Sequence, residues 1–536
     1  MDVQMESETT ERATYDKLLV WLRETRGVRM AEGKIGVARF EGEEGWGMAA
    51  LEEIEKGTTL FSIPRPPSTK SPLLALHSSR LIPSLDPHHR TLIANNWIPL
   101  LLVLLFERVQ AHLRPHDPLS WAPYFDTLPQ EFDTLMFWNQ DELAELTGST
   151  ILEKIGKEEA EKDYERVVKR LIESRPDLFP VPEGTTWEEN YGLAAYHRMG
   201  SLVLSRSFHV EAEPQQNSDQ SPDLQHDVSM DSAPSSINNP ASSDPAHDQS
   251  LDQISLPDSQ DHDDLEREAV QDIAMVPLAD LLNAKTGCEN AKLFYESDCL
   301  KMKATRNIKK GEQIYNTYGD PPNADLLRRY GYVDNPNRYD VVEISIKTCL
   351  EVAKTHLSSQ SPGVASSHLL EDRLEWALEM GLDDVFEIPT ELERKKQGIR
   401  LLPDDLTCIL QILLLTRDEF GRHKAKEELP KPKLHHPEVM VLAQKVINRR
   451  MADYPTTIDE DQRQLEALGA ASHHQSRVKI KRKIKAIIVR KSEKEILASL
   501  ARSLAHKQQL VLNPDSQKRK SIHDCNNPSR PKKRSF

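Results

Sequence analysis

The 536 residues of the chain exceed what one hydrophobic core normally serves, which predicts two or three structural units. A hydrophobic fraction of 38%, a mean hydropathy of −0.58 and a net charge of −16 are typical of a soluble protein. The longest apolar run, Ile98 to Phe106, is too short for a membrane helix of roughly 20 residues, so no membrane partner is expected. Glu6, Glu8 and Glu11 stand where a secretory signal would carry positive charge, which predicts residence inside the cell.

Residues 15–66 are predicted to form a helix and the first strands of a small antiparallel sheet. The apolar residues of Tyr15 to Glu24 fall on one helical face. Strand-like alternation runs from Val37 to Ile63, with a turn at Gly57.

A Glu44-Gly45-Trp46-Gly47 loop interrupts this first sheet. The missing side chains at Gly45 and Gly47 would let the backbone approach a ligand closely. An ordinary glycine turn between strands is the alternative interpretation.

Residues 67–210 have helical periodicity and are interpreted as a helical insertion. Its apolar clusters lie at Ile98 to Val109, Glu142 to Ile155 and Leu193 to Leu204. An acidic insert at 211–267 follows, and from Glu211 to Glu266 it holds 14 acidic residues but no Lys, Arg or aromatic residue. Such a segment buries too little apolar area to offset its ordering entropy, so disorder is predicted.

Residues 268–337 are predicted to form short strands at Lys292 to Tyr295, Cys299 to Ala304 and Gln313 to Tyr318. A helix capped by Asn323 and ended by Gly331 follows. Residues 338–510 are mostly helical in pattern.

Residues 511–536 form a basic tail, and positive charge is concentrated from residue 477 onwards, with 18 Lys and Arg against 4 Asp and Glu. Clusters at Lys479 to Lys485, Lys518 to Lys520 and Arg530 to Arg534 favour binding of RNA or of a nuclear import receptor. A solvated tail is the alternative.

The cysteines are scattered without a Cys-x-x-Cys pair, so no disulfide framework and no structural metal is expected. The His-His pairs lack acidic or cysteine companions at metal-ligand spacing.

The block from Met275 to Val333 pairs an Asp280-Leu281-Leu282-Asn283 turn with Asn316-Thr317-Tyr318-Gly319. Together with the upstream Gly-Trp-Gly loop, it resembles the SET-domain protein lysine methyltransferases of the Rubisco methyltransferase-like branch. The closest resemblance is to the fungal ribosomal lysine N-methyltransferase 4 group. Segments at Tyr454 to Asp461 and Ala486 to Arg490 resemble the helical substrate-binding domain of that branch. The resemblance implies an α+β fold, with SET-fold sheets, a pseudoknot-like core, a helical insertion and an all-helical C-terminal domain.

The resemblance implies S-adenosylmethionine as the cofactor and assigns its contacts. Contact with the donor is carried over to Glu44, Gly45 and Trp46, and Arg206 is placed near the donor's carboxylate, with a surface arginine as the alternative. In the turn, Asp280 would hold the loop and Asn283 would bind the donor through its amide. The family's usual His after this Asn is Ala284 here, which leaves only backbone contact.

Tyr318 is the predicted catalytic residue and also a donor contact. Methyl transfer is an in-line displacement that requires an oriented, neutral lysine amine, and a phenol can orient it. An apolar channel and the neighbouring sulfonium would lower the lysine pKa, so no dedicated general base is needed. Tyr330 corresponds to a second aromatic beside the cofactor or target lysine, with core packing as the alternative.

The resemblance implies monomethylation of a lysine in a large-subunit (60S) ribosomal protein. Another protein lysine, a histone lysine included, or a histidine is the first alternative, and a catalytically silent peptide-binding module is the second. The nucleus is the expected location, with the cytoplasm as a further one.

Overall fold

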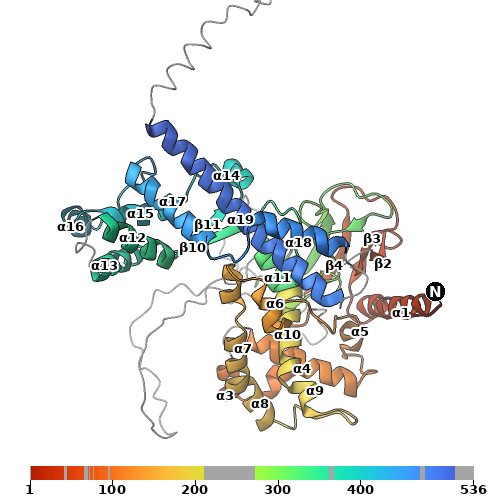
Figure 1. The fold of residues 1–536 in the computed structure, drawn as a ribbon. Coiled ribbons are helices and arrows are strands. Elements are labelled where there is room, and N and C mark those ends of the chain that lie inside the picture. Colours follow the sequence, from red (N-terminus) through yellow and green to blue (C-terminus); the bar gives the residue numbers. More distant parts are fainter. Residues whose placement is uncertain are drawn as a thin grey trace, which may run out of the picture. The chain divides into compact units, whose positions relative to one another are not determined.

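The computed structural model describes residues 2–40, 45–65, 71, 73–75, 78–93, 97–210, 272–360, 367–470 and 477–512. The chain forms two compact units, and Figure 1 shows its elements. The first unit comprises Met1–Phe132 and Lys157–Asp320, and the second comprises Asp133–Gly156 and Pro321–Phe536. Residues 133–156, which the sequence analysis assigns to the helical insertion, therefore lie in the second unit. The acidic insert and most of the basic tail fall outside the described residues.

The first unit combines short strands with helices. Its helices are α1 (Asp2–Glu24), α2 (Leu81–Ser84), α3 (Pro87–Leu92), α4 (Ile98–Leu113), α5 (Ala122–Phe125), α7 (Lys157–Asp163), the π-helical η4 (Tyr164–Val168), α8 (Lys169–Ser174), α9 (Trp187–Tyr191) and α10 (Leu193–Arg206). Its strands are β1 (Arg29–Met30), β2 (Ile35–Phe40), β3 (Gly45–Ala50), β4 (Thr59–Pro64), β5 (Ser207–Val210), β6 (Asp272–Met275), β7 (Ala291–Tyr295), β8 (Cys299–Ala304) and β9 (Gln313–Ile314).

The strands of the first unit pair across long sequence distances. One sheet has the order β1-β4-β8-β7 and another has the order β2-β3-β9, so strands from both sides of the helical insertion share each sheet. The strand predicted over Gln313 to Tyr318 is shorter than expected, since only Gln313 and Ile314 pair as a strand. Beyond them the backbone turns to run beside residues 283–284.

Helices α4, α9 and α10 pack against one another (Figure 1). The apolar run that begins at Ile98 is buried on nearly every side in α4, as is typical of a helix at the centre of a core. Among the described residues, no helix has both the length and the apolar character needed to cross a membrane.

Strands β5 and β6 place the two ends of the acidic insert side by side. Ser207 pairs with Met275 and Val210 pairs with Asp272 in an antiparallel ladder.

We therefore expect that replacing residues 211–271 with Asn-Gly, which favours a two-residue hairpin turn, will leave the first unit folded. Because loop length changes closure entropy only slowly, the variant should unfold like the parent, and the methyl-transfer activity that the resemblance implies should stay within about threefold of the parent rate. Steady-state kinetics and thermal melting check this, and loss of the folded transition would contradict it.

The second unit is mostly helical. Its helical elements are η2 (Leu135–Phe137), α6 (Gln140–Ala144), η3 (Thr150–Lys154), α11 (Asn323–Tyr330), α12 (Ile346–Gln360), α13 (Ser367–Glu379), α14 (Glu391–Gln397), α15 (Asp404–Leu414), α16 (Arg417–Lys426), α17 (Pro437–Met451), α18 (Ile458–Ala470) and α19 (Arg477–Leu512). A single antiparallel pair, β10 (Val341–Ser345) and β11 (Val385–Pro389), accompanies them in the described part. Helix α17 packs against α12, α15 and α19 around an apolar core.

Helix α11 ends as predicted but begins differently. Gly331 adopts a left-handed conformation at φ +75° and ends the helix. Asn323 is not the cap, because it is the first residue of the helix. Its buried side chain donates to Asp340 Oδ2 at 2.9 Å and accepts from the Asp334 N–H at 2.8 Å. Asn323 therefore ties α11 to the segment that follows it.

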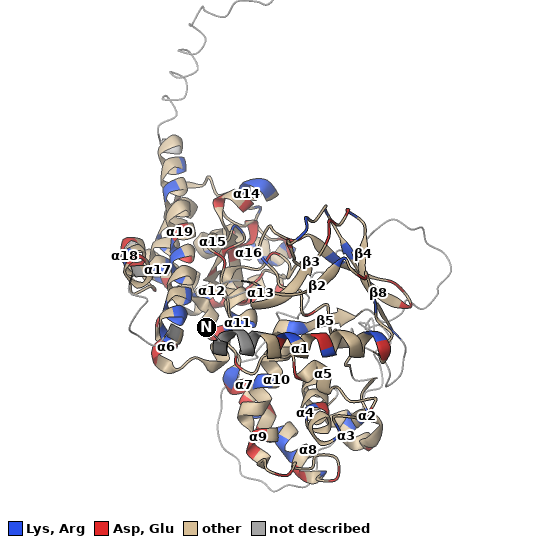
Figure 2. Cartoon of the chain, turned by 90° about the vertical axis from the view of Figure 1, so that its right-hand side faces the viewer, with Lys and Arg blue, Asp and Glu red and all other residues tan. Residues whose placement is uncertain are grey.

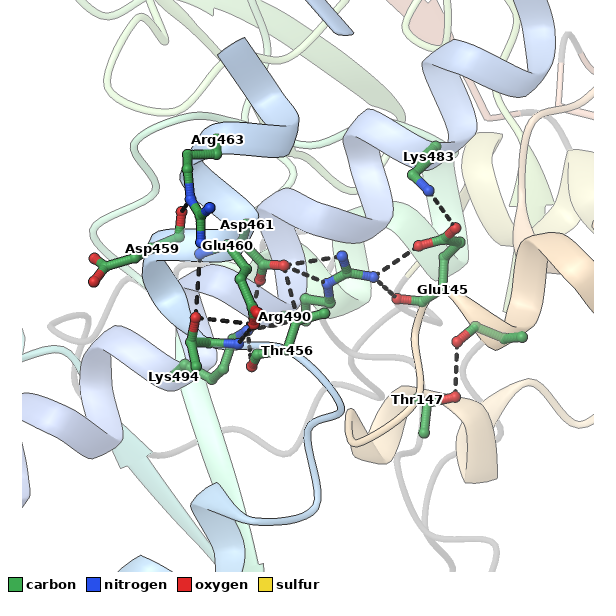
Figure 3. A network of polar contacts seen from close by, with 12 residues as sticks. Glu145, Thr147, Thr456, Asp459, Glu460, Asp461, Arg463, Lys483, Arg490 and Lys494 are labelled. Atoms are coloured by element: carbon green, nitrogen blue, oxygen red, sulfur yellow. Dashed lines mark hydrogen bonds and ion pairs between the residues drawn. The ribbon is translucent and has the colours of Figure 1, made fainter. Parts of the chain in front are cut away.

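Buried ion pairs fasten α18 to α19, as Figure 3 shows. Asp461 is fully buried and accepts from Arg490 Nε at 3.0 Å and Nη2 at 2.9 Å, while Lys494 Nζ lies 2.6 Å from its other oxygen. Arg490 Nη1 also donates to the Glu145 carboxylate at 2.9 Å. Two cations thus share one buried carboxylate.

Lys and Arg recur along α19 (Figure 2), but several of them are engaged inside the second unit. Arg482 pairs with Asp133 and Glu142, and Lys485 donates to the Gly331 carbonyl at 2.7 Å. These partners show that the cluster predicted over Lys479 to Lys485 largely serves internal packing. The clusters at 518–520 and 530–534 lie outside the described residues.

Candidate active site

Three segments that are far apart in the sequence meet in the first unit. Strand β3 pairs with β9, with Met48 opposite Ile314. The Asn283 side chain donates from Nδ2 to the Trp46 carbonyl at 3.4 Å, and the Asn316 N–H donates to the Asn283 carbonyl at 3.0 Å. The Gly-Trp-Gly segment, which forms the start of strand β3 rather than the predicted loop, therefore meets the Asp-x-x-Asn turn and the segment leading to Tyr318 at one place.

Gly47 allows this close approach. A Cβ atom at this position would lie 2.9 Å from Asn283 Nδ2 and 2.9 Å from Gln313 Nε2, which is closer than real Cβ contacts. Gly45, at the start of β3, has a φ of +62° and would meet nothing within 4 Å. The two positions thus require glycine for different reasons. At Gly47 a side chain would not fit, and at Gly45 the backbone adopts a left-handed conformation.

Asp280 is the buried anchor of the turn. Its Oδ2 accepts from the Tyr124 hydroxyl at 2.7 Å, and Arg206 Nη1 donates to its main-chain carbonyl at 2.7 Å. The same Arg206 nitrogen lies 3.9 Å from Asp280 Oδ2, and the arginine side chain keeps 28% exposure. Leu278, two residues earlier, is a buried non-glycine residue at φ +78°. Asp280 is therefore tied to a turn that contains the strained Leu278, while Arg206 still has an exposed side, and the donor-site roles of both residues stay predictions.

Burial raises the pKa of Asp280 from 3.8 to about 6, although Arg206 opposes the shift. A raised folded pKa means that the stabilising contribution is complete below pH 3.8 and is lost as the pH rises through 6. We therefore expect the wild type to lose roughly 2 to 3 kcal/mol of unfolding free energy, relative to Asp280→Asn, between pH 4 and pH 7. Urea unfolding of both proteins across this range measures the difference, and parallel pH profiles would contradict the assignment.

The backbone of Trp46 lies where the three segments meet, whereas its ring contacts helix α1. The indole Nε1 donates to Glu11 Oε2 at 2.8 Å, and the ring centroid lies 4.9 Å from that of Tyr15. The sequence analysis expected Trp46 to contact a donor. The Trp46 atom that meets Asn283 is its carbonyl oxygen, while the indole is held by α1.

Tyr318 lies at the end of the third segment and is partly buried. Burial raises the pKa of its phenol, while Arg206 lowers that pKa and Asp280 raises it, which places Tyr318 within electrostatic reach of both. Gly319, at φ +84°, donates its N–H to Thr317 Oγ1 at 2.9 Å and fixes the turn around the tyrosine. A neutral phenol at physiological pH follows, able both to donate and to accept a hydrogen bond.

The three remaining predicted site residues have different outcomes. Ala284 lies beside Asn316 through a parallel backbone bridge, so it is part of the assembly. Glu44 falls outside the described residues. Tyr330 belongs to α11 of the second unit, where its ring centroid lies 6.2 Å from that of Tyr332, so its assigned role stays a prediction.

Sequence reasoning missed three contributors. No local pattern assigns a site role to Tyr124, Glu11 or Gln313, yet Tyr124 holds Asp280 and Glu11 holds Trp46. The only signals available in the sequence were the position of Tyr124 among apolar residues and that of Gln313 at the start of a buried strand.

This arrangement fits a cationic donor that carries a carboxylate and an adenine. Gln313 is buried with both amide atoms unpartnered among the described residues, and its amide lies with that of Asn283 over Gly47, where a Cβ would collide with both. Arg206, with its exposed side, can pair with a carboxylate. The chemistry of these groups matches S-adenosylmethionine.

The SET domain family model matches residues 45–319, which is more than half of the chain and includes all three converging segments. The chain belongs to the SET-domain family. A second model, described as Rubisco LSMT substrate-binding, matches residues 364–497. The predicted α+β class, with a SET fold and a helical C-terminal domain, is confirmed.

Two curated relatives are protein-lysine methyltransferases by name. Ribosomal lysine N-methyltransferase 4 of Saccharomyces cerevisiae is 32% identical over 63% of this chain and 59% of its own length. The human N-lysine methyltransferase SETD6 is 28% identical over 76% of this chain and 72% of its own length. The chain thus spans less than two thirds of the yeast relative.

Solved structures share the fold. A SET domain of LSMT bound to lysine and AdoHcy superposes with a TM-score of 0.59 at 18% identity, covering 96% of this chain and 97% of that one. Rubisco LSMT bound to sinefungin and monomethyllysine gives 0.58 at 19%, covering 94% and 93%.

As a member of this family, the protein is a protein-lysine methyltransferase with S-adenosylmethionine as its methyl donor. The donor supplies an activated methyl group, and side chains of the protein position the donor and the acceptor amine. Asn283, Gly47 and Arg206 are the residues that we expect to hold the donor, while the neutral Tyr318 phenol is suited to orient an incoming amine.

Proposed function

We propose that this methyltransferase monomethylates a lysine of a large-subunit ribosomal protein. The observation that carries the proposal is the similarity to the yeast enzyme named ribosomal lysine N-methyltransferase 4. A net charge of −16 also favours association with a basic protein, and proteins that bind ribosomal RNA are basic. The helical second unit, matched by the substrate-binding model, would provide the docking surface.

Incubation of the protein with large ribosomal subunits and isotopically labelled S-adenosylmethionine tests this proposal. Mass spectrometry of the digested subunits should find one labelled lysine that carries a single methyl group. The Tyr318→Phe variant is the matched control and should label that peptide about 100-fold more slowly. Labelling of many lysines at similar low rates would count against a ribosomal target.

A non-ribosomal protein lysine is the second candidate target. It is suggested by SETD6, whose name specifies a lysine but no ribosomal target, and whose similarity extends over more of this chain than that of the yeast relative. Labelling of fractionated cell extract alongside the subunits separates the two, because the preferred acceptor should be methylated at the lowest concentration.

Nuclear residence is part of the proposal. It rests on the Arg530 to Arg534 run, which suits an import receptor. Fusion of residues 511–536 to a fluorescent reporter, compared with a version whose basic residues are replaced by Gln, tests whether the tail directs import. Equal distribution of both reporters would remove the import receptor as a partner.

A further inference from the structure

One polar side chain of the first unit is buried without satisfying either of its hydrogen-bonding atoms. Gln313 is 5% exposed, and neither its Nε2 nor its Oε1 has a hydrogen-bond partner within the described ranges. Buried amides are nearly always paired, because an amide removed from water without a partner is destabilising. The Gln313 side chain therefore needs a partner that these residues do not supply.

The backbone around Gln313 is firmly held, so the side chain has little freedom to turn elsewhere. The Asn290 amide donates to the Gln313 carbonyl at 2.8 Å, and the Asn290 side-chain oxygen accepts from the Tyr315 N–H at 2.8 Å. Gln313 is also paired with Ala49 across the β3–β9 ladder. With the backbone held in this way and the side chain buried, the direction in which the amide points is well defined.

That direction is towards the donor site. Gly47 and Ala49 are two residues apart on β3 and share one face of the sheet, which is the face that Gln313 occupies opposite Ala49. A Cβ on Gly47 would lie 2.9 Å from Gln313 Nε2 and 2.9 Å from Asn283 Nδ2. The two amides thus converge over the same glycine, so the Gln313 side chain lies beside the Asn283 amide that the resemblance assigns to the donor.

We propose that Gln313 is a further donor-binding residue, whose side-chain amide hydrogen-bonds to a polar group of S-adenosylmethionine beside Asn283. The donor carries an ammonium, a carboxylate and an adenine, and an amide that both donates and accepts is matched to such groups. Gln313 thus shapes donor affinity and is separate from Tyr318, which acts on the acceptor amine.

Gln313→Leu in the full chain tests the proposal, with S-adenosylmethionine titrated by calorimetry and the donor-free protein melted in parallel. We expect the donor Kd to rise about tenfold, which corresponds to one lost hydrogen bond. The donor-free melting temperature should stay equal or rise, because an unpaired buried amide is replaced by an apolar side chain of similar size. A purely structural role would instead lower that temperature.

Gln444→Leu on α17 is the matched control, because its side-chain oxygen is also buried and unpartnered but lies in the second unit. It should bind the donor with parental affinity. Gln313→Met provides a second variant with an unbranched side chain in case Leu does not fit. Donor affinity within twofold of the parent in the folded Gln313 variants would overturn the proposal, as would weaker binding accompanied by a lower donor-free melting temperature in both.

Discussion

Tyr318→Phe is expected to lower kcat for methyl transfer by about 100-fold while the donor Kd changes by less than about threefold. The substitution removes only the hydroxyl, so the ring keeps its place and the Gly319 N–H can still donate to Thr317 Oγ1 in the adjoining turn. Without the hydroxyl, nothing at that position holds the amine in line with the breaking carbon–sulfur bond. Single-turnover kinetics with saturating donor, together with calorimetry, separate the chemical step from donor binding.

Tyr315→Phe is the comparison for this prediction, since it removes a phenolic hydroxyl from the same segment. We expect it to change kcat by less than about fivefold, because any loss should concern packing around the site rather than orientation of the amine. A Tyr318→Phe enzyme with unchanged turnover would remove Tyr318 from the mechanism. Equal losses in both variants would make the effect one of general packing.

Asp461→Asn is expected to destabilise the second unit by about 3 to 5 kcal/mol. The carboxylate is fully buried, and it balances Arg490 and Lys494, which are themselves nearly fully buried. Burial raises the pKa of Asp461, but hydrogen bonds from the two cations outweigh this effect and lower its pKa below the ordinary value. Asparagine keeps the shape but removes the charge that the two cations share, so Lys494 loses the carboxylate at 2.6 Å and Arg490 keeps only its ion pair with Glu145.

Chemical denaturation that resolves the unfolding of the second unit measures this change. Asp459→Asn is the matched control, because it makes the same charge change at an exposed position two residues earlier on α18. We expect that control to stay within about 0.5 kcal/mol of the parent. If Asp461→Asn unfolds with the same free energy as Asp459→Asn, the buried ion pairs do not fasten α19.

Local patterns predicted the elements of this protein well where they were regular. The strand Cys299–Ala304 has the predicted bounds, and the helix ended by Gly331 stops at the predicted place. Helix α10 extends the cluster predicted at Leu193 to Leu204 by two residues. In each case, alternation, helical periodicity or a glycine supplied a local signal.

Features that depend on distant partners were not predictable in this way. The segment after Ile314 leaves the strand because its neighbour is residues 283–284, a pairing that no local pattern reveals. Lys485 reads as a free surface cation in the sequence but is buried beside Asp133, 352 positions earlier. The unpaired amide of Gln313 likewise becomes apparent only when Gly47 and Asn283 are placed beside it.

A crystal structure of the protein with S-adenosylhomocysteine and a methyllysine peptide is the most direct test of the account. We predict that the cofactor will contact the backbone at Gly45 to Gly47 and the Asn283 amide, and that the lysine nitrogen will lie within hydrogen-bond distance of the Tyr318 hydroxyl. Cofactor bound away from Asn283, or a lysine nitrogen remote from Tyr318, would contradict it.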